Sequence, residues 1–136
     1  MRSRHLSKFL LAALVSLGCA AARGADIYVI ANPQVKLSSE DVREIYLGDK
    51  EFSGEVRLAP VDNQAALAGF VVKALGMNPQ RYSTLWVKKA FRDGLTPPAL
   101  KATDFEVLEF VKRTRGAVGY LSSVPRDKDV VVVGKF

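Results

Sequence analysis

Histidine and cysteine are almost absent from this chain of 136 residues. Each occurs once, as His5 and Cys19, and both precede residue 25. The chain from residue 25 onward therefore has no imidazole and no thiol. This excludes Ser-His-Asp and Cys-His catalysis, zinc sites built on His or Cys, and disulfides. The glycines form neither a Walker phosphate loop nor a dinucleotide-binding pattern. We expect no enzyme activity, no cofactor and no metal site.

Long hydrophobic runs are also missing, apart from FLLAALVSLG at residues 9–18. This run is too short to span a bilayer. Basic residues precede it, and small residues follow it in CAAARGA, which is the order found in a secretory signal peptide. We therefore expect residues 1–24 to be a cleaved signal peptide, cut after Ala22 or Gly24. The remaining chain would then act in a bacterial-type periplasm or outside the cell.

Cys19 leaves a second possibility open at this end of the chain. Gly18 before the cysteine suits a lipid-attachment site, whereas Ser16 stands where such sites usually have leucine. A lipidated protein would be anchored to a membrane rather than spanning it. We regard lipidation as the less favoured alternative to simple cleavage.

Positive charge is scarce once the signal peptide is set aside. The whole chain has 20 basic and 14 acidic residues, but Arg2, Arg4, Lys8 and Arg23 all belong to the first 24 residues. Sixteen basic and 14 acidic residues then remain, so the net charge falls from +6 to about +2. The only basic cluster, KRTR at 112–115, follows a predicted helix, where cations complement the helix dipole. We expect no binding to nucleic acid.

The hydrophobic pattern predicts an α/β domain over residues 25–136, with a central sheet of about four strands and about four helices. The expected strands are 26–31, 56–61, 117–121 and 129–134. The expected helices are 37–48, 64–76, 78–94 and 103–116. Helix signals accompany these ranges, because Ser38, Asn78 and Thr103 can begin helices and Gly48 and Gly76 can end them.

Each predicted helix has one apolar face that we expect to be buried. The residues on these faces are Val42, Ile45 and Tyr46; Leu67, Phe70, Val71 and Ala74; Tyr82, Leu85, Trp86 and Ala90; and Phe105, Leu108 and Val111. Gly116 and Gly119, in the segment RGAVGY, are expected to allow a tight turn and close backbone packing.

The order of these elements resembles a known family. The stretches IYVIANP (27–33), LSSEDVREIYLGDKEF (37–52) and VRLAPVDNQAALAGFVVKALG (56–76) are similar to the phosphate-type periplasmic substrate-binding proteins of ABC importers. LWVKKAFRDGLTPP (85–98) and EVLEFVKRTRGAVGYL (106–121) continue the resemblance in the same order. The chain resembles the short single-domain relatives of that family more than its full-length members. The resemblance implies one lobe of a periplasmic-binding-protein-like fold, whereas full-length members hold ligand between two lobes.

The resemblance also implies a change at the phosphate site. In the family, an arginine follows the second strand and a Ser-Gly-Thr run opens the next helix, and these groups bind phosphate. At the matching positions this chain has Asp62, followed by Ala66, Leu67 and Ala68. The donors are absent and the charge is reversed, so we expect phosphate to bind weakly or not at all. Instead, Asp62 or Asn63 is expected to cap the helix, a contact worth ~1 kcal/mol.

The polar residues left for a ligand lie near the ends of predicted strands and at helix starts. In α/β folds, ligands bind at the carboxyl edge of the sheet, and we expect the candidates to share one such edge. The candidate ligand-binding residues are Asn32, Ser38, Ser39, Asp62, Asn63 and Gln64.

Two functions are consistent with these observations. The first is a non-enzymatic exported protein that binds a small solute, or acts as an accessory to a transport or signalling system. Its expected partners are the solute, a membrane transporter or sensor protein, and a second copy of the chain in a homodimer. The alternative is an envelope adaptor that has lost solute binding and docks another protein through a sheet edge or a helix face.

Overall fold

The structure is a computed structural model that describes residues 25–136. The expected signal peptide, residues 1–24, lies outside the described residues, and so does Cys19. The elements, in order, are β1 (Tyr28–Ala31), α1 (Asp41–Tyr46), β2 (Phe52–Ser53), β3 (Val56–Arg57), β4 (Ala59–Asn63), α2 (Leu67–Leu75), α3 (Pro79–Asp93), β5 (Ala99–Lys101), α4 (Asp104–Arg113), β6 (Ala117–Leu121) and β7 (Val131–Lys135). Within this described part, no helix is both long and apolar enough to cross a membrane.

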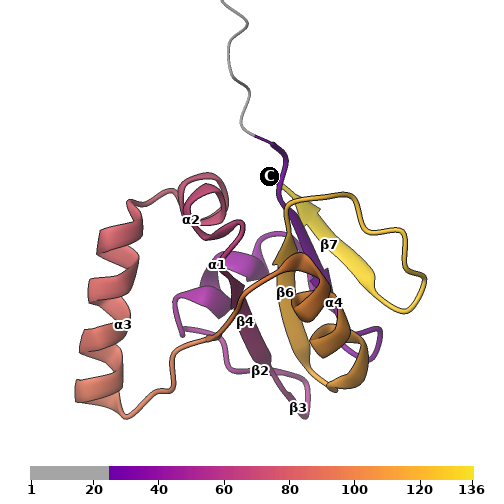
Figure 1. The fold of residues 1–136 in the computed structure, drawn as a ribbon. Helices are drawn as coiled ribbons and strands as arrows, with labels where there is room; N and C mark the ends of the chain where they lie inside the picture. The colour runs from indigo at the N-terminus through magenta and orange to yellow at the C-terminus, as the bar shows by residue number, and fades with distance from the viewer. Residues whose placement is uncertain (1–24) are drawn as a thin grey trace, which may run out of the picture.

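The α/β fold class is confirmed. Five strands form one sheet in the order β5-β4-β6-β1-β7, and β2 with β3 forms a separate hairpin. Strand β4 runs parallel to β5 and β6, whereas β1 runs antiparallel to both β6 and β7. The sheet is therefore mixed, with both parallel and antiparallel pairs of strands. Figure 1 shows α4 close to β6 and α3 standing at the side of the molecule remote from β7.

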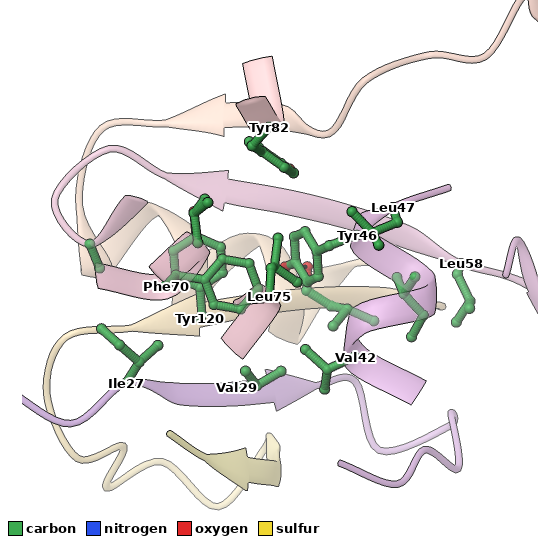
Figure 2. Packing of buried hydrophobic residues seen from close by; sticks show 14 of the residues in the cluster. Ile27, Val29, Val42, Tyr46, Leu47, Leu58, Phe70, Leu75, Tyr82 and Tyr120 are labelled. Carbon is green, nitrogen blue, oxygen red and sulfur yellow. Dashed lines mark hydrogen bonds between the residues drawn. The ribbon is translucent and has the colours of Figure 1, made fainter. Parts of the chain in front are cut away.

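Buried side chains fill both faces of the sheet, because successive residues of a strand point to opposite faces. On β6, Val118 and Tyr120 join the larger core cluster, which includes residues of α1, α2 and α3, while Ala117 and Leu121 join the smaller cluster with α4. At the centre of the larger cluster the ring of Phe70 stacks on Tyr120 with centroids 3.8 Å apart (Figure 2). The sheet thus lies between α4 and the three other helices.

Most predicted helix signals are confirmed. Asn78 caps α3, since its Oδ1 accepts a hydrogen bond from the N–H of Gln80 at 2.7 Å, and Pro79 is the first helical residue. Thr103 caps α4 through the N–H of Glu106. Gly76 ends α2 in the left-handed conformation, with φ of 64°. Local side-chain chemistry therefore fixes where these helices begin and end.

The start of α1 differs from the prediction. Ser38 does not cap this helix, which begins at Asp41 without a side-chain cap. Instead, the carboxylate of Asp41 accepts hydrogen bonds from the N–H and the hydroxyl of Ser38. Lys50 also contacts Asp41 at 2.9 Å, which favours this reversed direction of bonding.

Three further predictions are wrong in detail. The expected strand 56–61 is divided at Leu58 into β3 and β4. Strand β5 was not predicted, because it directly follows the loop-like sequence TPP. Phe105 is not buried, because 70% of its surface is exposed. Val107 takes the buried position on α4 in its place, next to Gly119 of β6.

Gly119 allows α4 to pack directly on the backbone of β6. A Cβ atom at this position would overlap Cγ1 of Val107 and come within 3.3 Å of Cγ2 of Val61. Gly116, with φ of 83°, is needed for a different reason, since a Cβ there would overlap the carbonyl oxygen of Arg57. Both glycines therefore have the roles in close packing and turning that their sequence context predicts.

We expect Gly119→Ala to lower the free energy of unfolding by about 1–3 kcal/mol, because the added methyl group overpacks the α4–β6 contact. Val107→Ala should partly relieve the overlap, so the double variant should be more stable than the sum of the single effects predicts. Urea denaturation measures all three. Gly69→Ala is the matched control: its Cβ would lie 3.5 Å from Ile27, so the helix-favouring substitution should leave stability unchanged or slightly raised. Equal effects of the two glycine substitutions would contradict this packing.

Candidate functional site

The six candidate residues do not share one edge of the sheet, so that prediction is wrong. Asn32 follows the carboxyl end of β1, and its N–H bonds to the carbonyl of Ala117, where β6 begins. Asp62 and Asn63 lie at the carboxyl end of β4, which runs parallel to β6. Because β1 is antiparallel to β6, Asn32 and Asn63 lie at opposite ends of the sheet. Gln64 stays with Asn63, and its N–H bonds to the carbonyl of Lys101.

Asn32, Ser38 and Ser39 hold the β1 side of the fold together. The side-chain amide of Asn32 donates to the carbonyls of Val111 and Lys112 at 3.0 and 3.4 Å, and its Oδ1 accepts from Gln34. It thereby satisfies two carbonyls that the last turn of α4 leaves free. Ser38 bonds to Asp41, while Ser39 lies against Gly134 of β7. These contacts are all with other residues of the chain, and they stabilise the fold.

Asn63 is fully buried and its side chain is fully used. Its Nδ2 donates to Asp104 Oδ1 at 2.7 Å and to the carbonyl of Tyr120 at 2.9 Å, and its Oδ1 accepts from the N–H of Ala65. Asp104 also accepts hydrogen bonds from Ser122 and Ser123. Burial raises the pKa of Asp104, but these hydrogen bonds outweigh burial and hold it below its ordinary value. This network connects β4, α4 and the end of β6.

Neither Asp62 nor Asn63 caps α2, contrary to the prediction, because this helix begins after Ala66 without a side-chain cap. Asp62 is a residue of strand β4 with 6% of its surface exposed, and α2 begins only at Leu67. Its Oδ2 accepts a hydrogen bond from the hydroxyl of Tyr82 at 2.9 Å, and its Oδ1 accepts one from Tyr120, also at 2.9 Å. The turn after β4 spaces Asp62 away from the helix start, so the carboxylate instead bridges α3 and β6.

The environment of Asp62 opposes its charge. Burial raises its pKa from the ordinary 3.8 to about 6, although the hydrogen bonds from Tyr82 and Tyr120 partly counteract the increase. The same burial, together with the nearby carboxylate, raises the pKa of both tyrosines far above the usual value. Burial likewise raises the pKa of Tyr46, whose hydroxyl donates to the carbonyl of Val61 at 2.8 Å. The tyrosines therefore stay protonated and donate.

Asp62 lies in the wall of a groove of about 700 Å³ between α3 and the sheet. It is the only charged residue among the described residues that line this groove. The others are mainly apolar or aromatic: Leu67, Pro79, Tyr82, Ser83, Trp86, Val87, Ala90, Phe91, Pro97, Pro98 and Leu100. Volume and lining are those of a small-molecule pocket with a single charged polar group.

Trp86 and Tyr82 place α3 over this groove. The indole N–H of Trp86 donates to the carbonyl of Tyr46 at 3.0 Å, and Tyr82 reaches Asp62 one turn earlier. Lys89 contacts the carbonyl of Leu47 and the carboxylate of Asp49. These polar contacts fix the helix above the core, while its side toward Leu100 remains open as the groove.

The sequence contained one unused indication of this arrangement. Tyr82 lies on the predicted buried face of its helix, and a buried tyrosine hydroxyl requires a polar partner. Tyr120 lies in a strand with an entirely buried pattern and has the same requirement. Asp62 was available as a shared acceptor, whereas the groove itself depends on the path of residues 94–98 and has no local signal.

Comparison with known proteins gives a likeness in fold only. No protein-family model and no curated protein sequence matches the chain. An ABC-type phosphate transport receptor from Vibrio cholerae is similar over 80% of this chain and 46% of that protein, with 19% identity and a TM-score of 0.47. PstS from Borrelia burgdorferi is similar over 71% of this chain and 41% of that protein, with 13% identity and a TM-score of 0.47. The chain thus spans less than half the length of either structure.

The raised pKa of Asp62 predicts a pH-dependent stability that Asp62→Asn removes. Because the folded pKa of about 6 exceeds the ordinary 3.8, the contribution of Asp62 to stability is fully present below pH 4 and is lost as pH rises through 6. Between those limits the unfolding free energy of the wild type should fall by up to ~3 kcal/mol relative to Asp62→Asn. Denaturant unfolding at several pH values measures this difference.

Tyr82→Phe provides a second measurement of the same effect. It removes a donor that lowers the pKa of Asp62, so the pH-dependent change should move to higher pH. Carboxyl NMR titration of Asp62 reads the pKa directly in both proteins. A constant difference between wild type and Asp62→Asn across this range would show that Asp62 ionises normally.

Proposed function

We propose that this protein is a non-enzymatic binding domain that holds a small solute in the groove between α3 and the sheet. The solute has an apolar or aromatic body and a cationic or hydrogen-bond-donating group. The single observation that carries this proposal is the buried carboxylate of Asp62 in the wall of an otherwise apolar groove. The apolar walls favour the body of the ligand, and the carboxylate selects its polar group.

Charge complementarity determines the sign of the ligand. Asp62 is the only charged residue in the described lining, so a cation entering the groove gains attraction to the carboxylate. An anion would meet the carboxylate without any basic side chain to offset the repulsion. The solved structures with similar folds include a phosphate transport receptor, but the groove of this chain supports the opposite preference.

The expected setting is the cell envelope. Export through residues 1–24 would place the domain in the periplasm, where it would serve as an accessory to a transport or signalling system. A membrane transporter or sensor protein and a second copy of the chain are the proposed protein partners. The adaptor alternative differs in one respect, because an adaptor has no reason to discriminate between small ligands by charge.

Three probes with the same ring and different charges test the proposal. Benzylamine is a cation at pH 7, benzyl alcohol is neutral and benzoate is an anion. We expect benzylamine to bind most tightly and benzoate least. The chain has one tryptophan, Trp86, and it lines the groove, so its fluorescence reports binding. Amide chemical shifts of Leu67, Tyr82 and Leu100 locate the site.

Asp62→Asn is the matched control for this series. It keeps the size of the side chain and removes the charge, so the preference for benzylamine over benzyl alcohol should disappear. Lowering the pH below 6 should have the same effect in the wild type, because Asp62 then becomes protonated. Binding of all three probes with equal affinity, or shifts remote from the groove, would favour the adaptor.

Inorganic phosphate is expected to bind no more tightly than in the millimolar range. The donors that phosphate requires are absent at Ala66, Leu67 and Ala68, and Asp62 repels the anion. Calorimetric titration of the described domain measures this directly. A micromolar affinity for phosphate would overturn the assignment of the ligand's charge.

A further inference from the structure

The outer side of α3 combines exposed apolar residues with a row of cations. Phe91 is 91% exposed and Val87 is 67% exposed, and Leu100 on the neighbouring β5 is 56% exposed. All three also line the groove described above, so this apolar strip is the exposed rim of the groove. Beside them, a shallow hollow of about 380 Å³ runs along the same helix. Its lining is mostly basic: Arg81, Thr84, Leu85, Lys88, Lys89, Arg92 and Asp93. The helix thus has a positively charged strip next to an apolar one.

Three of these cations are not used by the fold. Arg81, Lys88 and Arg92 make no side-chain ion pair or hydrogen bond with any described residue, whereas Lys89 is held by Asp49 and the carbonyl of Leu47. Asp93 is the only acidic residue on α3. The unpaired positive charge of this surface therefore favours an anionic partner.

Helical geometry shows that one flat surface can contact both strips. At 100° per residue, the arc from Val87 through Phe91 and Lys88 to Arg92 covers roughly 140° of the helix. Phe91 and Lys88 lie on either side of the middle of this arc. Tyr82 and Trp86 point to the opposite side, into the core (Figure 2 shows Tyr82). In Figure 1 α3 stands at the margin of the described part of the molecule.

We propose that the outer face of α3 docks on an anionic phospholipid bilayer. Phe91 and Val87 enter the boundary between headgroups and acyl chains, while Arg81, Lys88 and Arg92 contact lipid phosphates. A helix with cations on one strip and an aromatic side chain on the next has the composition of an interfacial membrane helix. A flat partner is favoured over a peptide in the groove, because the cations lie on the flank of α3 away from the groove.

Co-sedimentation with vesicles tests this docking. The experiment uses residues 25–136, which contain the whole sheet and both core clusters, because the basic and apolar residues before them would bind vesicles by themselves. We expect binding to an equimolar mixture of phosphatidylglycerol and phosphatidylcholine, and little binding to phosphatidylcholine alone. Added salt should weaken the binding, because it screens the exposed cations.

Paired variants make the test specific to α3. Each cation near a charged membrane is worth roughly five-fold in affinity, so Lys88→Gln with Arg92→Gln should weaken binding about 25-fold. Arg126→Gln with Lys128→Gln removes the same charge from another exposed segment and should have little effect. Phe91→Ser should also weaken binding, whereas Phe105→Ser, on the exposed side of α4, should not.

Two results would overturn the proposal. Equal losses from the two double variants would mean that net charge, not the α3 face, controls binding. Absence of binding to the phosphatidylglycerol vesicles would exclude the bilayer and leave an acidic protein surface as the partner for these cations. Circular dichroism of each variant verifies that the fold is unchanged, as expected for exposed residues.

Discussion

The buried carboxyl group of Asp62 joins strand β4 to helix α3 and strand β6. It accepts one hydrogen bond from Tyr82 of α3 and one from Tyr120 of β6, and thereby joins three elements that are distant in sequence. Tyr120 in turn stacks on Phe70 of α2. Together with the contacts of Trp86 and Lys89, this buried acid therefore sets the position of α3, with the groove on one flank and the basic strip on the other.

Local features of the fold could be predicted from the sequence because their causes are local. The amide of Asn78 reaches the N–H of Gln80, two residues away, and Pro79 sets the backbone for the first turn. Gly76 needs only its own freedom to adopt positive φ. The buried faces of α1 and α3 follow from residue spacing alone. Phe105 escaped this reasoning because Val107, not Phe105, lies against Gly119, and only the structure shows which face of α4 packs on that glycine.

Strand direction and side-chain partners could not be predicted in this way. The segment 28–31 has the same pattern whether it runs parallel or antiparallel to β6, yet the choice decides whether Asn32 lies beside Asn63 or at the opposite end of the sheet. Asp62 shows the same limit. A carboxylate near a helix start is a good capping group. In this fold, however, the buried hydroxyls of Tyr82 and Tyr120 donate to Asp62 in place of the free N–H groups of α2. Both outcomes depend on contacts between residues far apart in sequence.

The two tyrosines give each carboxylate oxygen of Asp62 a hydrogen bond, but they do not neutralise its charge. Each hydroxyl supplies one hydrogen bond, but both remain neutral, and the pKa of about 6 shows that burial outweighs them. Near neutral pH the fold therefore retains a charge that destabilises it. Such conflicts between local chemistry and stability are expected at functional sites. A cation in the groove would stabilise the ionised carboxylate and lower its pKa, so ligand binding near pH 6 would release a proton. The same ligand would strengthen the contact that positions α3, which links the groove to the face that we propose meets the membrane.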